Sequence, residues 1–162
     1  RSAQVVSQNL NKIGLKTKVK TYDFGAWISR MQKGDFQLAI GWTEKGTTPY
    51  NLYKGMMSPD YIKPLGEVAD VNWHRFSSRS ADALLRQYEK TSDEKEIKNI
   101  IYDLQRIFVE TAPSLPLFAE ASWAECNTTH FTNFPSATNP YGTLSPNYEN
   151  ENFFLMLNVK PR

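Results

Sequence analysis

The stretch GDFQLAIGW, residues 34–42, carries most of the information about the fold. After Gly34 and Asp35, the segment Phe36–Trp42 is a short and nearly continuous apolar run, interrupted by Gln37 alone among polar residues. Short apolar runs of this kind are typical of strands that are covered on both faces in a parallel sheet. We therefore expect Phe36–Trp42 to be a central buried strand.

The residues before this stretch alternate between helical and strand patterns. Residues 2–14 place apolar side chains at helical spacing and end in Gly14, a natural helix terminator. Residues 15–23 alternate apolar or Thr positions with lysines, which predicts a strand exposed on one side. Residues 24–34 again have helical spacing and end in a glycine. Helix, strand, helix and strand in succession are typical of an α/β domain.

The residues after this stretch predict a long loop and then two strong helices. Residues 46–78 are rich in Pro, Gly and aromatic residues, with one short helix expected near residues 50–56. Residues 81–90 and 94–111 have strong helical periodicity and are expected to pack as a hairpin, with a Thr91–Glu94 capping box. Residues 114–126 predict a last strand, and residues 123–162 include an irregular tail.

Composition and motifs exclude several classes of function. The 162 residues suffice for one compact domain, and 19 basic against 17 acidic residues, with lysines spread along the chain, indicate no nucleic-acid partner. Cys126 is the single cysteine, so an internal disulfide and an all-cysteine zinc site are ruled out. No nucleophile-elbow, Walker, zincin or dinucleotide motif occurs, and the two histidines stand far apart. We therefore expect a protein that is not an enzyme, without cofactor or metal.

Aromatic residues fall in segments that are unsuited to a core. Phe, Trp and Tyr make up 13% of the residues, and many lie in irregular segments, which indicates a recognition surface or a small cluster under long loops. Trp42 stands at the carboxyl end of the expected strand, where open α/β sheets bind ligands. Trp73 is a second candidate, whereas Trp27 lies on a helical stripe expected to face the core. The alternative for Trp42 is that it packs beneath the Pro-rich loop.

Several short motifs, in their order and spacing, resemble a known family. They are I-G-L at residues 13–15, G-D-F and G-W at either end of the stretch 34–42, D-A-L-L at 82–85, A-P at 112–113 and L-P-L-F at 115–118. Over roughly residues 3–122 the chain resembles the C-terminal lobe of the family 5 extracellular solute-binding proteins, the oligopeptide- and dipeptide-binding class of ABC importers.

The resemblance implies a fold, a location and partners. Residues 1–162 would form one α/β lobe of a two-lobed, type II periplasmic-binding-protein-like fold, with a small sheet flanked by helices. An N-terminal lobe of the same protein would be its partner, and closure on a ligand would precede delivery to a membrane permease, with no chemistry performed. The location would be periplasmic or extracellular, with a lipoprotein anchor as one option.

The loop after Trp42 departs from the peptide-binding members of this family. Their loop resembles W-x-x-D-x-x-x-P, whose aspartate takes the amino terminus of the peptide, but Lys45 occupies that position here. Glu44 replaces the acid only if the loop shifts by one residue. Aromatic faces with polar neighbours suit sugar rings, so an oligosaccharide is the favoured ligand and an oligopeptide the alternative. A protein-interaction module with aromatic loops is an alternative of another class. The expected ligand-binding residues are Trp42, Glu44, Lys45, Thr47, Thr48, Tyr50, Asn51 and Trp73.

Overall fold

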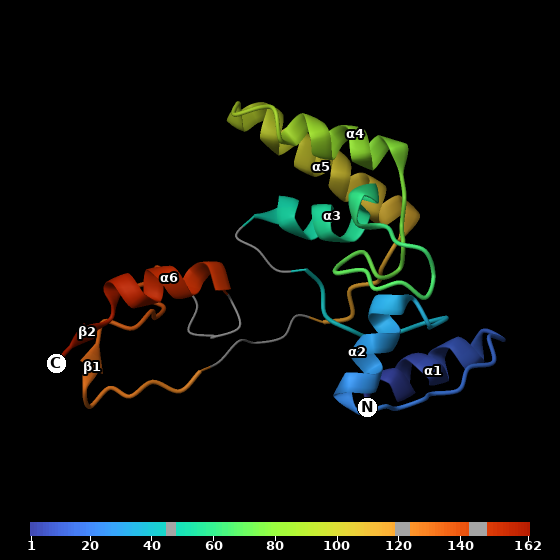
Figure 1. Ribbon diagram of the computed structural model, residues 1–162, viewed down its shortest axis with the longest axis horizontal. Coiled ribbons are helices and arrows are strands. Elements are labelled where there is room, and N and C mark those ends of the chain that lie inside the picture. Colours follow the sequence, from blue (N-terminus) through green and yellow to red (C-terminus); the bar gives the residue numbers. More distant parts are fainter. Residues whose placement is uncertain (45–47, 119–123, 143–148) are drawn as a thin grey trace.

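The computed structural model describes residues 1–44, 48–118, 124–142 and 149–162, and the side chains of residues 149–151 are outside that description. The described residues form a helix-rich architecture with one small sheet (Figure 1). In chain order the elements are α1 (Ser2–Lys12), α2 (Phe24–Lys33), α3 (Pro49–Met57), the 3-10 helix η1 (Pro59–Tyr61), α4 (Arg79–Tyr88), α5 (Glu94–Thr111), β1 (Phe131–Thr132), α6 (Glu149–Asn158) and β2 (Lys160–Pro161).

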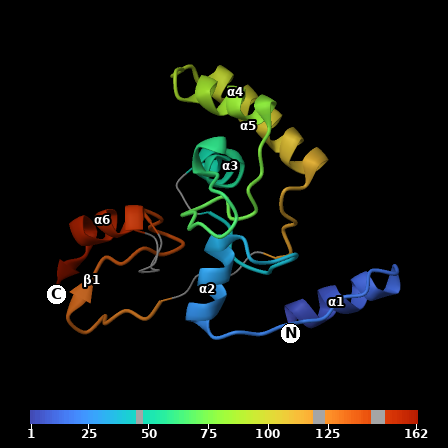
Figure 2. The same cartoon turned by 45° about the vertical axis from the view of Figure 1, so that its right-hand side comes forward.

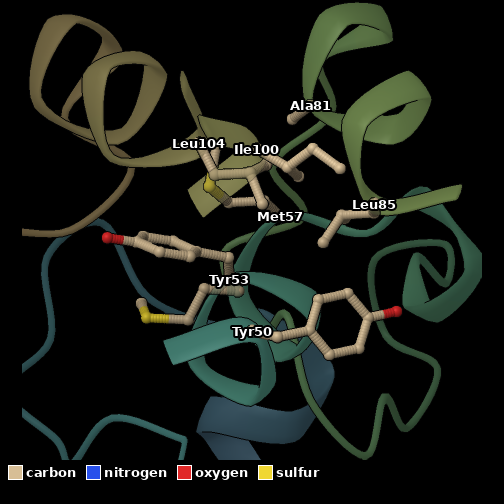
Figure 3. Packing of buried hydrophobic residues seen from close by; sticks show 8 residues of the cluster. Tyr50, Tyr53, Met57, Ala81, Leu85, Ile100 and Leu104 are labelled. Atoms are coloured by element: carbon tan, nitrogen blue, oxygen red, sulfur yellow. The ribbon is translucent and has the colours of Figure 1, made fainter. Parts of the chain in front are cut away.

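The hydrophobic core lies where α3 packs against the hairpin of α4 and α5. Both ribbon views place α3 directly beside this hairpin (Figures 1 and 2). The helices form because their apolar residues recur at helical spacing and so line one face of each helix. Buried side chains from all three helices meet in Figure 3, and the core consists of Tyr50, Tyr53, Met56, Met57, Ala81, Leu85, Ile100 and Leu104. The expected hairpin of α4 and α5 is confirmed.

The ends of the helices follow local chemistry, with one correction. Gly34 ends α2 in the left-handed conformation, at φ 70°, as expected from the sequence. At the start of α5 the cap is Asp93, whose Oδ1 accepts the backbone N–H of Glu96 at 2.7 Å. The predicted Thr91–Glu94 capping box is therefore wrong. Thr91 instead lies before the cap, where its hydroxyl accepts the backbone N–H of Asp93 and donates to the carboxylate of Glu96.

The strands predicted for residues 15–23 and 36–42 are absent. Of the strand predicted for residues 114–126, residues 114–118 and 124–126 form no strand, and residues 119–123 lie outside the described residues. A strand is stable only when a neighbouring strand accepts its backbone hydrogen bonds. Residues 15–23 run along α1 instead, where the backbone N–H of Thr17 donates to Asn11 Oδ1 at 2.9 Å. In residues 36–42, Leu38 is 74% exposed. Within the described parts of the chain, these segments have the composition of strands but no pairing partner.

The C-terminal segment has more regular structure than its sequence predicts. β1 pairs antiparallel with β2, with Phe131 opposite Pro161 and Thr132 opposite Lys160. The intervening chain contains α6 (Figure 1). Phe153, Phe154 and Met156 on this helix are exposed. The first residues of α6 are polar and β2 contains a proline, so neither segment has the residue pattern typical of a helix or a strand.

Candidate functional site

Four aromatic side chains from three separate segments meet at the N-terminal part of α2. We call Phe24, Trp27, Trp42 and Trp73 the aromatic cluster. Its closest pair is Trp27 and Trp42, with ring centroids 4.8 Å apart, and Trp73 meets Trp42 edge-on at 5.7 Å. Phe24 stacks on Trp42 at 6.3 Å with an interplanar angle of 22°. The structure thus brings the two predicted site tryptophans, Trp42 and Trp73, into direct contact.

Local sequence explains how α2 presents its share of the cluster. Asp23 caps α2 because its Oδ1 accepts the backbone N–H of Ala26 at 2.9 Å. The helix therefore starts at Phe24, and Phe24 and Trp27 lie three residues apart on one face. Gly41 packs on this face, since a Cβ there would be in van der Waals contact, at 3.4 Å, with both the Trp27 ring and the Met31 side chain.

Two of the four rings in the aromatic cluster are exposed to solvent. Trp42 is 50% exposed and Phe24 is 68% exposed, while Trp27 and Trp73 are partly buried. The indole N–H of Trp73 donates to the backbone carbonyl of Asp70 at 2.9 Å. Exposed aromatic faces on a fixed backbone can stack against apolar surfaces of a ligand without reorganisation.

Glu44 lies close to Trp42 in the sequence and is partly withdrawn from water. It follows Trp42 by two residues, and its side chain lies against Gly55 of α3. Burial raises the pKa of the Glu44 carboxyl above its usual range. Within the described residues this carboxylate has no hydrogen-bond donor, so it is available to accept from a hydroxyl or ammonium group of a ligand.

Gly55→Ala tests the packing of Glu44 on α3. A Cβ at Gly55 would come within 2.2 Å of Glu44 Cγ and 3.0 Å of its Cβ. In an unhindered helix this substitution stabilises by about 0.5–1 kcal/mol, because alanine is the better helix former. Here we expect no gain, or a loss of up to about 1–3 kcal/mol from overpacking. Urea unfolding of the variant measures the sign, and a full gain in stability would contradict the contact.

The other predicted site residues lie in different surroundings. Tyr50 lies in the core, stacked on Tyr88 with centroids 4.1 Å apart, and its hydroxyl donates to Glu89 Oε1 at 2.7 Å. Burial is the largest cause that raises the pKa of Tyr50, and the hydrogen bond to Glu89 is the next largest; the pKa is raised to about 12. Lys54 also donates to Glu89, at 2.6 Å, so this end of α3 is tied to the end of α4. The structure does not bring Tyr50 to the aromatic cluster.

The remaining predicted residues border α3 or fall outside the description. Thr48 is exposed at the N-cap position of α3, and Asn51 is partly exposed in the first turn of that helix. Lys45 and Thr47 lie outside the described residues. Binding by all of these residues stays a prediction.

His74 lies beside the aromatic cluster in sequence but points into the protein. Its Nε2 is buried and has no partner among the described atoms. Burial lowers the pKa of His74, while a backbone hydrogen bond with Met56 acts in the opposite direction. The neutral form is therefore favoured in the folded protein.

This burial predicts a pH dependence of stability. The unfolded chain binds a proton at His74 at a higher pH than the folded chain does, since the reference pKa is about 6.5. The contribution of His74 is thus fully present above about pH 6.5 and is lost as the pH falls toward the lower folded-state pKa. Urea unfolding between neutral and mildly acidic pH should show this loss, and His74→Gln should reduce the slope. An equal slope in both proteins would contradict the assignment.

Two members of the aromatic cluster were missed as site residues by sequence reasoning. The sequence predicts Trp27 in the core, and it predicts no site role for Phe24, the first of residues 24–34 with helical spacing. The spacing of Phe24 and Trp27 does indicate a shared surface, because residues three positions apart in a helix lie on the same face. Among the described residues, the structure has no group of three or more His, Cys, Asp or Glu side chains able to hold a metal ion. None of the described helices is long and apolar enough to cross a membrane.

Comparison with known proteins identifies relatives of this chain. No family model matches it. The chain is 26% identical over 117 residues to di/tripeptide-binding protein 4 of Pseudomonas aeruginosa, which covers 72% of this chain and 21% of that protein. It is also 25% identical over 125 residues to heme-binding protein A of Haemophilus influenzae. This match covers 76% of this chain and 22% of that protein. The chain therefore spans about a fifth of the length of the curated relatives that it matches.

Solved structures match nearly the whole chain. A mannohexaose-bound periplasmic oligopeptide-binding protein of an oligopeptide ABC transporter from Thermotoga maritima superposes with a TM-score of 0.78 at 20% identity. The match covers 99% of this chain and 31% of that protein, and a second structure of the protein gives a TM-score of 0.79. The expected fold class, part of a periplasmic-binding-protein-like fold with a small sheet, is confirmed. The expected resemblance to the family 5 extracellular solute-binding proteins is confirmed by these relatives, which are named as di/tripeptide- and heme-binding proteins.

Proposed function

We propose that this chain is one lobe of the substrate-binding component of an ABC importer. In this proposal residues 1–162 form a single α/β lobe, and the N-terminal lobe of the same protein supplies the opposite wall of a cleft. The protein captures a ligand in the periplasm or outside the cell and delivers it to a permease. The relatives, which are named as binding proteins and are several times longer than this chain, support the proposal.

The aromatic cluster is the observation that carries the binding function. Its exposed side offers the rings of Trp42 and Phe24 as a platform, with the partly buried carboxylate of Glu44 two residues beyond Trp42. A ligand lying on this platform would displace water from apolar ring faces, which contributes roughly 25 cal/mol per Å² of apolar surface. Closure of a second lobe would complete the removal of water.

We favour an oligosaccharide as the ligand. The faces of sugar rings that carry C–H groups are apolar and suit tryptophan, while the hydroxyls at the ring edge require acceptors such as Glu44 and hydrogen-bonding residues such as Thr48 and Asn51. Lys45 and Thr47 would likewise form hydrogen bonds with sugar hydroxyls, and Trp73 would offer a second aromatic ring. The Thermotoga maritima protein, whose structure contains mannohexaose, supports this preference.

An oligopeptide or dipeptide is the second candidate. Pseudomonas aeruginosa relatives are named for binding di- and tripeptides. The Glu44 carboxylate would accept hydrogen bonds from a peptide ammonium group, an interaction strengthened by its partial burial. Lys45 opposes this role, because two cations at contact distance repel by about 1–4 kcal/mol in surroundings of high to intermediate dielectric constant.

Thermal unfolding of the full-length protein in the presence of candidate ligands separates the two proposals. Mannohexaose and cellobiose-type sugars should raise the melting temperature, since a ligand that binds only the folded protein stabilises it. Di- and tripeptides serve as the competing series. A rise with peptides but not with sugars would contradict the oligosaccharide proposal and support the peptide alternative, and no rise with either would contradict both.

A further inference from the structure

Arg75 is the most highly connected side chain in the loop between η1 and α4. Its guanidinium donates hydrogen bonds to five backbone carbonyls from different parts of the chain. Nε donates to Lys63, Nη1 donates to Trp73, and Nη2 donates to Gln32 and Glu67 at 3.0 Å and to Pro64 at 3.5 Å. Among the described residues, no carboxylate forms an ion pair with Arg75. The role of the side chain is therefore to organise backbone.

Two of these acceptors belong to the elements that build the aromatic cluster. Gln32 lies in the last turn of α2, the helix that carries Phe24 and Trp27, while Trp73 is a member of the cluster itself. One planar group thus holds α2 and the backbone of Trp73 together. A cation at the C-terminal end of α2 also interacts favourably with the helix dipole.

The backbone conformation of Arg75 and the space beside its side chain both fit this set of hydrogen bonds. Arg75 adopts φ 56°, a left-handed conformation that is unfavourable for a residue with a side chain. Gly34 leaves space for its guanidinium, because a Cβ at Gly34 would lie 2.6 Å from Arg75 Nη1. The unfavourable φ of Arg75 and the close approach of its guanidinium to Gly34 indicate that the hydrogen bonds of the guanidinium hold this backbone conformation in place.

We propose that Arg75 is a positioning residue that sets the orientation of Trp73 relative to Trp27 and Trp42. Lysine cannot replace it, because an ammonium group is a compact donor, whereas guanidinium presents five N–H groups in a fixed plane. The inference rests on the proposed function only in treating the aromatic cluster as a binding surface. Its geometric content concerns ring orientation and needs no ligand.

Circular dichroism of coupled indole rings tests this role. The rings of Trp42 and Trp73 are 5.7 Å apart at 77°, and those of Trp27 and Trp73 are 6.3 Å apart at 88°. Neighbouring indoles in fixed, non-parallel orientations give an exciton couplet. Trp73→Phe in the full-length protein identifies this couplet by difference. We expect Arg75→Lys to remove the same couplet while the helical far-UV signal is retained, and the surface substitution Arg106→Gln to leave it in place.

A second variant covers the case in which Arg75→Lys fails to fold. Gly34→Ala keeps the guanidinium but pushes against it, and we expect a weakened couplet in this variant. An unchanged couplet in a folded Arg75→Lys protein, or in Gly34→Ala if the first variant is unfolded, would overturn the proposal. Loss of the couplet in a protein that binds neither mannohexaose nor peptides would leave Arg75 as a positioning residue and contradict only the proposed function.

Discussion

Replacing Leu104 by alanine is expected to lower the free energy of unfolding by about 2–5 kcal/mol. Leu104 is fully buried on α5, among core residues from α3 and α4 (Figure 3). Truncation would remove apolar contacts on all sides and leave a cavity between helices that hold each other in place. This is the largest stability effect that we expect from a single substitution in the chain.

Urea unfolding of the parent protein and of Leu104→Ala measures this loss, because the cooperative transition depends on the packing of α3, α4 and α5. Val109→Ala is a matched control, since Val109 lies on the same helix but is 71% exposed. The control should change stability by no more than about 0.5 kcal/mol. A similar small effect of Leu104→Ala would show that α3 does not pack against the hairpin as described.

Trp42→Ala is expected to weaken ligand binding by about 1–3 kcal/mol in the full-length protein. The substitution removes the ring that contacts all three other members of the aromatic cluster. It also removes the most exposed indole of the described residues, one of the two rings of the proposed platform. The expected loss corresponds to roughly 5- to 150-fold in the dissociation constant.

Isothermal titration with mannohexaose, and with a dipeptide in parallel, measures the loss. Tyr102→Ala is a suitable control because Tyr102 is also an exposed aromatic residue, at 56%, but lies on α5 away from the cluster. Its removal should leave affinity unchanged. Equal affinity of the parent and Trp42→Ala for the ligand that binds would contradict a binding role for the aromatic cluster.

The helices could be predicted from the sequence because their determinants are local. The spacing of apolar residues and the glycine at position 34 define α2, and Pro113 follows the end of α5, although its cap, Asp93, is not the residue that the sequence predicts. The absence of a strand at residues 36–42 could not be predicted in this way. The apolar composition of this segment indicates burial, but a strand also requires a partner that a local pattern cannot identify.

The candidate site was predicted only in part, for a related reason. The position of Trp42 after an apolar run pointed to a site, and Trp73 was a second candidate, but their contact depends on the tertiary fold. The helical spacing of apolar residues predicts α2 correctly, but it also predicts that Trp27 faces the core. Tyr50 illustrates the opposite case, since the sequence predicts it as a binding residue but it packs in the helical core. Local pattern identifies the residues but does not fix which of them meet.

Chemical-shift changes of the indole N–H signals on titration with ligand test the central claim most directly. Trp→Phe substitutions at positions 27, 42 and 73 assign the three signals in the full-length protein. Mannohexaose should shift the signals of Trp42 and Trp73, with those of other tryptophans outside the cluster unaffected, at concentrations that match the dissociation constant from calorimetry. Saturable binding of mannohexaose or of a peptide with no change in the signals of Trp42 and Trp73 would contradict the claim that the aromatic cluster is the binding surface.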